Sequence, residues 1–273
     1  MHHWTKRLVA LAAPLLLTGC LWGPGKFNSD LTLRKDGSFI LDYRGEIVLQ
    51  LPDDESSKAW SPSMANCFEG EEASSGTVVL MPGAKPPKKR ACTAAEIAAQ
   101  KESYEKKRAE AEQTAKMFGL PGLDDASNRA FAAKLMKYAG WRSVTYRGKG
   151  VFDVDYHMEG RATQDFLFPA LPDNNLIIPF IAIRRRTDGA VLVTAPAMTG
   201  GSGPLGAAGS NAMGGETPTG PVSRAEGRLT VHTDGEILTN NSEDGAAADP
   251  LGRQVHWDVT TSSTKVPETL IRL

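Results

Sequence analysis

Alternating apolar and polar residues run through much of the chain, and this period of two is typical of β-strands with one buried face. The alternation first appears in residues 27–51, where Asp36-Gly37 interrupts it with a dipeptide typical of tight hairpin turns. It returns in the second half of the chain, in residues 142–160, 176–196, 227–241 and 253–260. Asp-Gly pairs also lie inside 176–196 and 227–241, so we expect each of these two segments to form a hairpin.

Residues 93–118, between these two β regions, have the pattern of a helix. Thr93 and Glu96 have the spacing of a capping box at its start. The segment is highly charged and has one narrow apolar stripe, so we expect it to be mostly solvated or to lie on a sheet by that stripe. Two acid–base pairs have the favourable i, i+4 order, Glu102 with Lys106 and Glu112 with Lys116.

A second helix is predicted over residues 125–139, where Phe131, Leu135 and Tyr138 share one face. A short linker containing Gly and Pro separates it from the first helix. Two helices joined in this way predict an αα-hairpin that spans residues 93–139.

The helices are grouped apart from the strands, and this order favours an α+β fold. We expect a mostly antiparallel β-sheet with the two-helix hairpin inserted, folded as a single domain over residues 27–273. The Gly-rich segment 198–221 is expected to be a flexible loop inside that domain. Its glycines are not followed by Gly-Lys-Ser/Thr or by a predicted helix, so they do not indicate a phosphate-binding loop.

The first twenty residues have the organisation of a signal peptide. Lys6 and Arg7 are followed by an apolar segment from Leu8 to Leu17. This segment is about ten residues long, whereas a helix that spans a bilayer needs about 20. An ordinary secretory signal has small residues at positions −3 and −1 from its cleavage site, and here the segment ends instead in Leu-Thr-Gly-Cys.

The stretch LLLTGC, which ends at Cys20, resembles the lipobox of bacterial lipoproteins. The resemblance implies that residues 1–19 are removed, that Cys20 carries a diacyl or triacyl anchor, and that residues 20–26 form a tether. Leu21 stands where Asp favours inner-membrane retention in Gram-negative lipoprotein families, so the resemblance implies the outer membrane of such a cell. A cysteine that falls by chance in an ordinary signal peptide is the alternative.

Cys67 and Cys92 are the two other cysteines of the chain. An oxidising periplasm or cell surface permits a disulfide between them, and the loop that it closes is about 25 residues, for a nominal stabilisation of about 3.5 kcal/mol. Two free buried thiols or a metal-binding pair are the alternatives. No neighbouring histidine or third cysteine completes a zinc-binding set in the sequence.

Residues 235–259 contain Gly-Glu-Ile, then Asn-Asn, then Gly-Arg-Gln-Val-His-Trp-Asp-Val. Together with a cysteine anchor that is followed at once by a hairpin, this series resembles the mycobacterial LppM-type lipoprotein domain. The helical insertion 93–139 departs from a compact form of that domain. The resemblance implies an architecture of strand, Asn-rich turn and Trp-containing strand, and implies no activity.

Candidate chemistry is sparse along the chain. The net charge of −1 provides no basic field for nucleic acid. On one predicted strand, Asp153, Asp155 and His157 alternate along the same face, where they could converge on a cation. The alternative is the solvated face of an amphipathic strand, with Arg142 or Arg147 as a cross-strand partner.

These observations favour a lipid-anchored cell-envelope protein with a non-enzymatic binding or structural role. Its expected partners are the membrane, through the lipid on Cys20, and an envelope protein or lipid whose identity the sequence does not give. We expect no cofactor, no catalytic residue and no nucleic acid. The alternatives are a periplasmic metal-dependent enzyme that uses the Asp153, Asp155 and His157 face, and a carrier of lipid or another small ligand.

Overall fold

The computed structural model describes residues 22–49, 59–68, 88–117, 121–122, 124–170, 179–199 and 224–273. Cys20 and almost all of the Gly-rich segment 198–221 lie outside the described residues. Met198 and Thr199, at the start of that segment, are described, and both are buried. These two residues therefore do not belong to the flexible loop that the sequence predicts.

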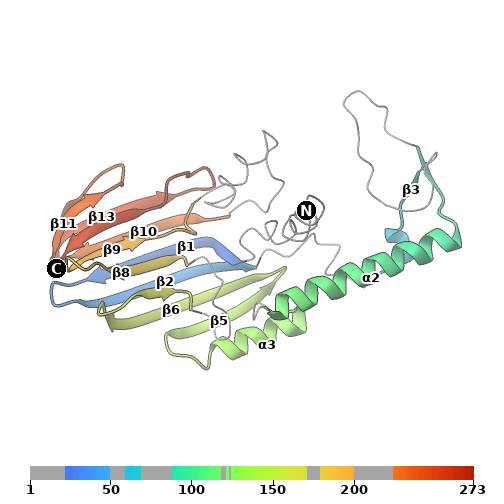
Figure 1. Cartoon of the computed structure of the whole chain (residues 1–273), viewed down its shortest axis with the longest axis horizontal. Coiled ribbons are helices and arrows are strands. Elements are labelled where there is room, and N and C mark those ends of the chain that lie inside the picture. The colour runs from blue at the N-terminus through green and yellow to red at the C-terminus, as the bar shows by residue number, and fades with distance from the viewer. Residues whose placement is uncertain are drawn as a thin grey trace, which may run out of the picture.

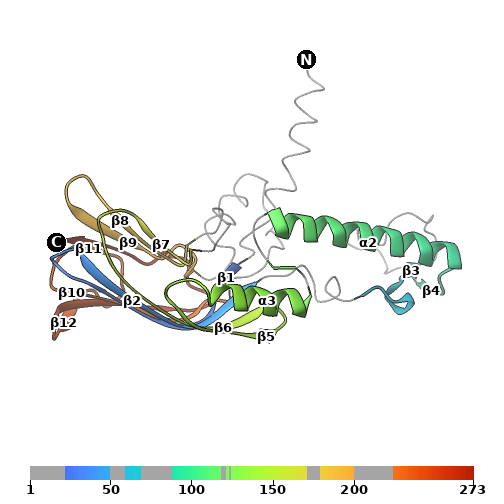
Figure 2. The same cartoon turned by 90° about the horizontal axis from the view of Figure 1, so that it is seen from below.

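Most of the described chain belongs to two β-sheets that pack face to face (Figures 1 and 2). The larger sheet has seven strands in the spatial order β12 (Ala247–Asp249), β13 (Gly252–Val259), β10 (Glu226–Thr233), β1 (Trp22–Leu33), β2 (Ser38–Leu49), β6 (Val151–Arg161) and β5 (Trp141–Gly148). The smaller sheet has five strands in the order β11 (Glu236–Asn240), β14 (Glu268–Arg272), β9 (Ala190–Thr194), β8 (Ile181–Arg185) and β7 (Phe166–Phe168). We call this pair of sheets the sandwich.

Aromatic side chains join the two sheets in the core. Tyr43 of β2 and Tyr156 of β6 contact Phe168 of β7, with ring centroids 5.0 and 4.4 Å apart. Tyr43 is fully buried, and its hydroxyl donates a hydrogen bond to the backbone carbonyl of Glu46 at 2.8 Å. Burial raises the pKa of this phenol well above its ordinary 10.0, so the core holds a neutral tyrosine.

The first strand begins at Trp22, five residues earlier than the predicted start of the domain at Phe27. Trp22 is 2% exposed, and its ring contacts the rings of Phe131 and Phe152 at 5.5 and 5.4 Å. A tether over residues 20–26 is therefore wrong for residues 22–26, because they are paired in β1. The apolar ring of Trp22 gains more from burial in the sandwich than from solvent exposure.

The pairing of strands agrees with two of the predicted hairpins and differs from a third. β1 and β2 form the predicted hairpin around Asp36-Gly37, and β8 and β9 form the one predicted over 176–196. The hairpin predicted over 227–241 is wrong, because β10 belongs to the larger sheet and β11 to the smaller one. β10 instead pairs in parallel with β1, while the other ladders between described strands are antiparallel.

Two helices follow β2 where the sequence predicts them, α2 (Ala94–Met117) and α3 (Asp125–Leu135), and the α+β class is confirmed. α3 packs on β5 with Phe131, Ala132 and Leu135 buried. α2 projects away from the sandwich in both views, without the extensive packing against α3 that an αα-hairpin implies (Figures 1 and 2). None of the described helices is both long and apolar enough to cross a membrane.

Candidate functional site

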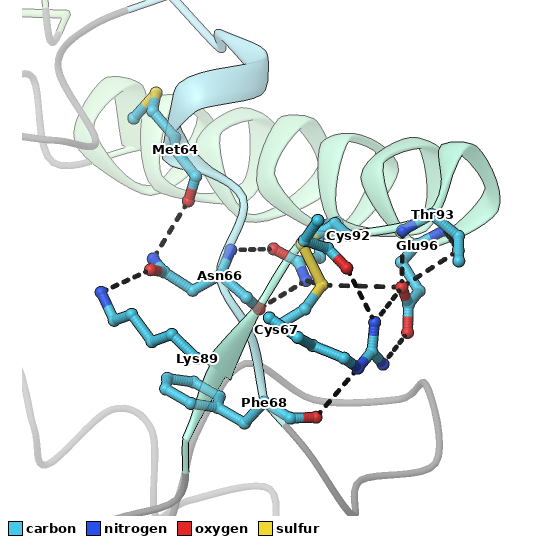
Figure 3. The surroundings of a disulfide bond; sticks show 11 residues. Met64, Asn66, Cys67, Phe68, Lys89, Cys92, Thr93 and Glu96 are labelled. Atoms are coloured by element: carbon cyan, nitrogen blue, oxygen red, sulfur yellow. Dashed lines mark hydrogen bonds and ion pairs between the residues drawn. A yellow bond between two sulfur atoms is a disulfide. The ribbon is translucent and has the colours of Figure 1, made fainter.

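The projecting part of the chain is a small unit of its own, which we call the arm and define as residues 59–68 and 88–117. It contains a short 3₁₀ helix (Pro62–Met64), the two-residue strands β3 (Cys67–Phe68) and β4 (Lys89–Arg90), and α2. β3 and β4 pair in an antiparallel ladder. Figure 3 shows that these pieces meet around a disulfide at the start of α2.

The predicted disulfide between Cys67 and Cys92 is confirmed, with the two Cα atoms 5.3 Å apart. It joins β3 to the residue that precedes the helix cap, Thr93. The backbone amide of Thr93 donates to the Glu96 carboxylate at 2.8 Å, and the backbone amide of Glu96 donates to the Thr93 hydroxyl at 3.3 Å. The predicted capping box is therefore present, and the disulfide holds the start of α2 against β3.

Glu96 also accepts hydrogen bonds from a second direction. The guanidinium of Arg90 donates to both carboxylate oxygens, at 2.9 Å from Nη1 and 2.5 Å from Nη2. These bonds, followed by those from Thr93, lower the pKa of the Glu96 carboxyl from its ordinary 4.5 to about 2. Both residues of β4 therefore have partners inside the arm: Arg90 contacts Glu96, and Lys89 donates to the Asn66 side chain at 3.1 Å (Figure 3).

One face of α2 lies on the segment 59–68. The Asn66 backbone amide donates to the Gln100 side chain at 3.1 Å, and that side chain donates back to the Asn66 carbonyl at 2.9 Å. One turn along, the ring of Tyr104 contacts the ring of Trp60, with centroids 5.4 Å apart. Trp60 and Tyr104 are far apart in the sequence, so no local pattern predicts that they touch. The narrow apolar stripe of the helix, which includes Tyr104, predicts only that this side of the helix is covered.

The ion pairs along α2 differ from the predicted ones. Lys101 pairs with Glu105 at 3.7 Å, and Arg108 pairs with Glu112 at 3.3 Å. The predicted pairs of Glu102 with Lys106 and of Glu112 with Lys116 are not found among the ion pairs of the described residues. Exposed side chains of this kind gain little from any one pairing, so the spacing does not decide which pair forms.

The residues considered for a metal site lie together on the outer face of the larger sheet, as the alternation predicts. Asp153 and Asp155 each lie beside an arginine, Arg147 at 2.5 Å and Arg44 at 3.4 Å. His157 has its own neighbours, the carboxylates of Asp42 at 2.8 Å and Glu159 at 3.3 Å. Within the described ranges, no group of three histidine, cysteine or acidic side chains is arranged to hold a metal ion.

The prediction that Asp153, Asp155 and His157 converge on a cation therefore receives no support from the geometry. Their side chains turn to separate partners on neighbouring strands, because an arginine or a carboxylate stands close to each of them. Arg147 is one of the two cross-strand partners that the alternative interpretation names. Charges neutralised pairwise in this way are typical of a solvated strand face.

Two further histidines, His232 and His256, lie on the same outer face of the larger sheet. His232 of β10 contacts Asp249 at 3.0 Å and Asp30 at 3.7 Å, and His256 of β13 contacts Asp244 at 3.2 Å. The backbone amide of Leu251, and then His232, lower the pKa of the Asp249 carboxyl. The strand order brings these groups together, and no pattern within one strand could have shown it.

Asp30 and Asp42 lie directly opposite each other on β1 and β2, and His157 follows Asp42 across to β6. Facing carboxylates repel, and a histidine ring stands beside each of them, with His157 at 2.8 Å from Asp42 and His232 at 3.7 Å from Asp30. This row therefore adds paired polar groups to the outer face of the larger sheet.

Trp22, the first residue of β1, packs against α3 and comes two residues after Cys20 in the sequence. The indole Nε1 of Trp22 and the side-chain oxygen of Asn128 are both buried without a hydrogen-bond partner. Asn128 lies on the buried face of α3, one turn before Phe131, whose ring contacts Trp22. Cys20 itself lies outside the described residues, so its role stays a prediction.

No protein-family model matches the chain, and no curated protein sequence is significantly similar to it.

Proposed function

We propose that this chain is a lipid-anchored protein of the cell envelope with a non-enzymatic binding or structural role, held by lipid on Cys20 at the outer membrane of a Gram-negative cell. The observation that carries the proposal is the stretch LLLTGC after a basic pair and a short apolar segment. The resemblance of the C-terminal strands to the LppM-type domain is compatible with it and remains a prediction.

The start of β1 at Trp22 supports a close attachment. Two residues span at most about 7 Å, so a lipid on Cys20 would hold the sandwich directly against the bilayer. An anchor of two or three acyl chains binds stably, whereas a single chain gives only marginal binding. The protein would then present its projecting arm and its charged outer face to other components at the membrane surface.

A binding role is favoured over catalysis because the polar side chains considered for a site form pairs with neighbouring side chains. Asp153, Asp155 and His157 are each paired with a neighbouring strand, and Glu96 is held by Arg90 and the helix cap. These contacts rigidify the sheet and the arm. The arm, stapled by the disulfide and extended by a helix about 36 Å long, is the part of the described chain best shaped to reach a partner.

The anchor is tested by Cys20→Ser in the full chain, expressed in a Gram-negative host that is fed an alkyne-labelled fatty acid. The wild-type protein should carry the label and sediment with membranes, and Cys20→Ser should lose the label and leave the membrane fraction. Cys67→Ser with Cys92→Ser is the matched control, because it removes the two other thiols and should leave labelling unchanged. Labelling that survives Cys20→Ser would disprove the anchor.

A further inference from the structure

The face of α2 that points away from the segment 59–68 has no partner within the described residues. Its side chains follow a spacing of four and three residues, which keeps them on one side of a helix and is the spacing of a coiled-coil seam. All of them are exposed: Ala95, Ala99, Glu102, Lys106, Ala109 and Gln113. We call this set the free face of α2.

The opposite side of the helix is already occupied. Gln100 and Tyr104 lie on the segment 59–68, and both are only partly exposed. The helix projects beyond the sandwich in both views (Figures 1 and 2). The side chains of the free face are all exposed to solvent. The free face is therefore an accessible surface on a rigid element.

The two charges in the middle of the free face are unused. Glu102 and Lys106 have the spacing and the order of a favourable ion pair within a helix, but neither has an ion-pair partner in the part of the chain that the structure describes. The neighbouring charges Lys101 and Glu105 do pair with each other, at 3.7 Å. Opposite charges four residues apart are thus left available at the centre of the seam.

The free face is complementary to itself when two copies pair in opposite directions. With the two-fold axis between Glu102 and Lys106, Glu102 of each copy lies opposite Lys106 of the other. Ala99 then lies opposite Ala109, and these small side chains permit close approach of the two helices. Ala95 and Gln113 meet at the two ends. The register places a and d positions opposite one another, as antiparallel coiled coils require.

We infer that the free face of α2 is the contact surface of a two-fold antiparallel dimer of this chain, held in register by two equivalent ion pairs between Glu102 and Lys106. A C2 interface requires one patch that complements itself, and this patch does. In a parallel pair, Glu102 would face Glu102 and Lys106 would face Lys106. The charges therefore select the antiparallel arrangement.

The interface is small, and the dimer is a weak one in dilute solution. Glu105 flanks the two-fold axis, and its intrahelical pairing with Lys101 reduces repulsion between the two copies at that point. Attachment of both copies to one membrane raises their effective concentration and favours pairing. The helix pairing itself does not depend on the proposed lipid anchor.

Charge reversal tests the inference, with self-association measured by energy transfer between donor- and acceptor-labelled full chains in detergent and in vesicles. Glu102→Lys alone, or Lys106→Glu alone, places like charges opposite each other twice, and should raise the dissociation constant by about tenfold or more, since 1.4 kcal/mol corresponds to tenfold. The double variant restores both pairs and should associate like the wild type. An equimolar mixture of the two single variants should also associate, because each then complements the other.

Lys107→Glu is the matched control, since it makes the same change of charge one residue away, on another side of the helix. It should associate like the wild type, and circular dichroism should show equal helix content in all variants. Carbodiimide crosslinking of mixed heavy- and light-isotope wild-type chains should join Glu102 of one copy to Lys106 of another. Single variants that associate like the wild type, a mixture that fails to associate, or equal loss in Lys107→Glu would each overturn the inference. Because the detergent measurement needs no anchor, it stands even if Cys20 carries no lipid.

Discussion

Removal of the Cys67–Cys92 disulfide should loosen the arm and leave the sandwich intact. The two cysteines are 25 residues apart, and closing a loop of that length restricts the unfolded arm by about 3.5 kcal/mol. The two strands of the arm, β3 and β4, have only two residues each, so their pairing adds little stability of its own. We therefore expect Cys67→Ala with Cys92→Ala to increase local opening at the start of α2 by about 300-fold, since 1.4 kcal/mol corresponds to tenfold.

Hydrogen–deuterium exchange with peptide mapping measures this change directly. Peptides from the first turns of α2 should lose protection in the double variant, and peptides from β2 and β6 should keep it, because the arm contributes nothing to the sandwich core. Reduction of the wild-type protein should reproduce the effect. Unchanged protection at the start of α2, or a sandwich that melts several degrees earlier, would refute this reasoning.

Two further predictions concern the start of the sandwich and the helix cap. Trp22→Ala should reduce the free energy of unfolding by about 3–5 kcal/mol, because it empties a buried site against α3, whereas Tyr138→Ala at a 45% exposed position should change it by less than about 0.5 kcal/mol in the same denaturant titrations. For Glu96, the lowered pKa means that its contribution is complete above pH 4.5 and is lost as the pH falls toward 2. NMR titration of the Glu96 carboxyl should give a midpoint near 2, and Arg90→Ala should raise it; an unmoved midpoint would show that Arg90 is not the cause.

Local features of the fold followed directly from the sequence. Alternation and Asp36-Gly37 are sufficient for the β1–β2 hairpin, because consecutive strands joined by a short loop that contains a turn-forming pair have few other ways to pair. Thr93 and Glu96 mark the start of α2 in the sequence because both hydrogen bonds of the capping box form between residues only three positions apart. Alternation shows which face of a strand is buried but not which strand lies beside it. The parallel pairing of β1 with β10, and the passage of the chain from β10 to β11 in the other sheet, therefore lay beyond it.

The same limit explains the candidate site. Alternation correctly puts Asp153, Asp155 and His157 on one face, and Arg147, the partner of Asp153, lies only six residues earlier. The partners of Asp155 and His157 are on β2, more than 100 residues earlier. When the strand order is unknown, three residues of the types that bind metals on one strand face resemble an incomplete metal site. The strand order places Arg44 beside Asp155 and Asp42 beside His157, which gives two separate pairs. The Cys67–Cys92 disulfide was predictable because only two cysteines follow Cys20 in the sequence. The contacts that form the arm around the disulfide were not predictable, because they join segments that are distant in the chain.

The pairing of β1 with β10 also determines when the protein can finish folding. Lys26 lies opposite Glu226, so a strand near the beginning of the chain waits for one that is synthesised 200 residues later. A chain that emerges from its N-terminus can form the β1–β2 hairpin early and add β6 when it arrives, but one edge of β1 stays open throughout. An open edge invites wrong pairing with other chains. Synthesis of this protein therefore includes a long interval in which this strand edge is exposed, and a chaperone that acts during it has a definite strand edge to protect.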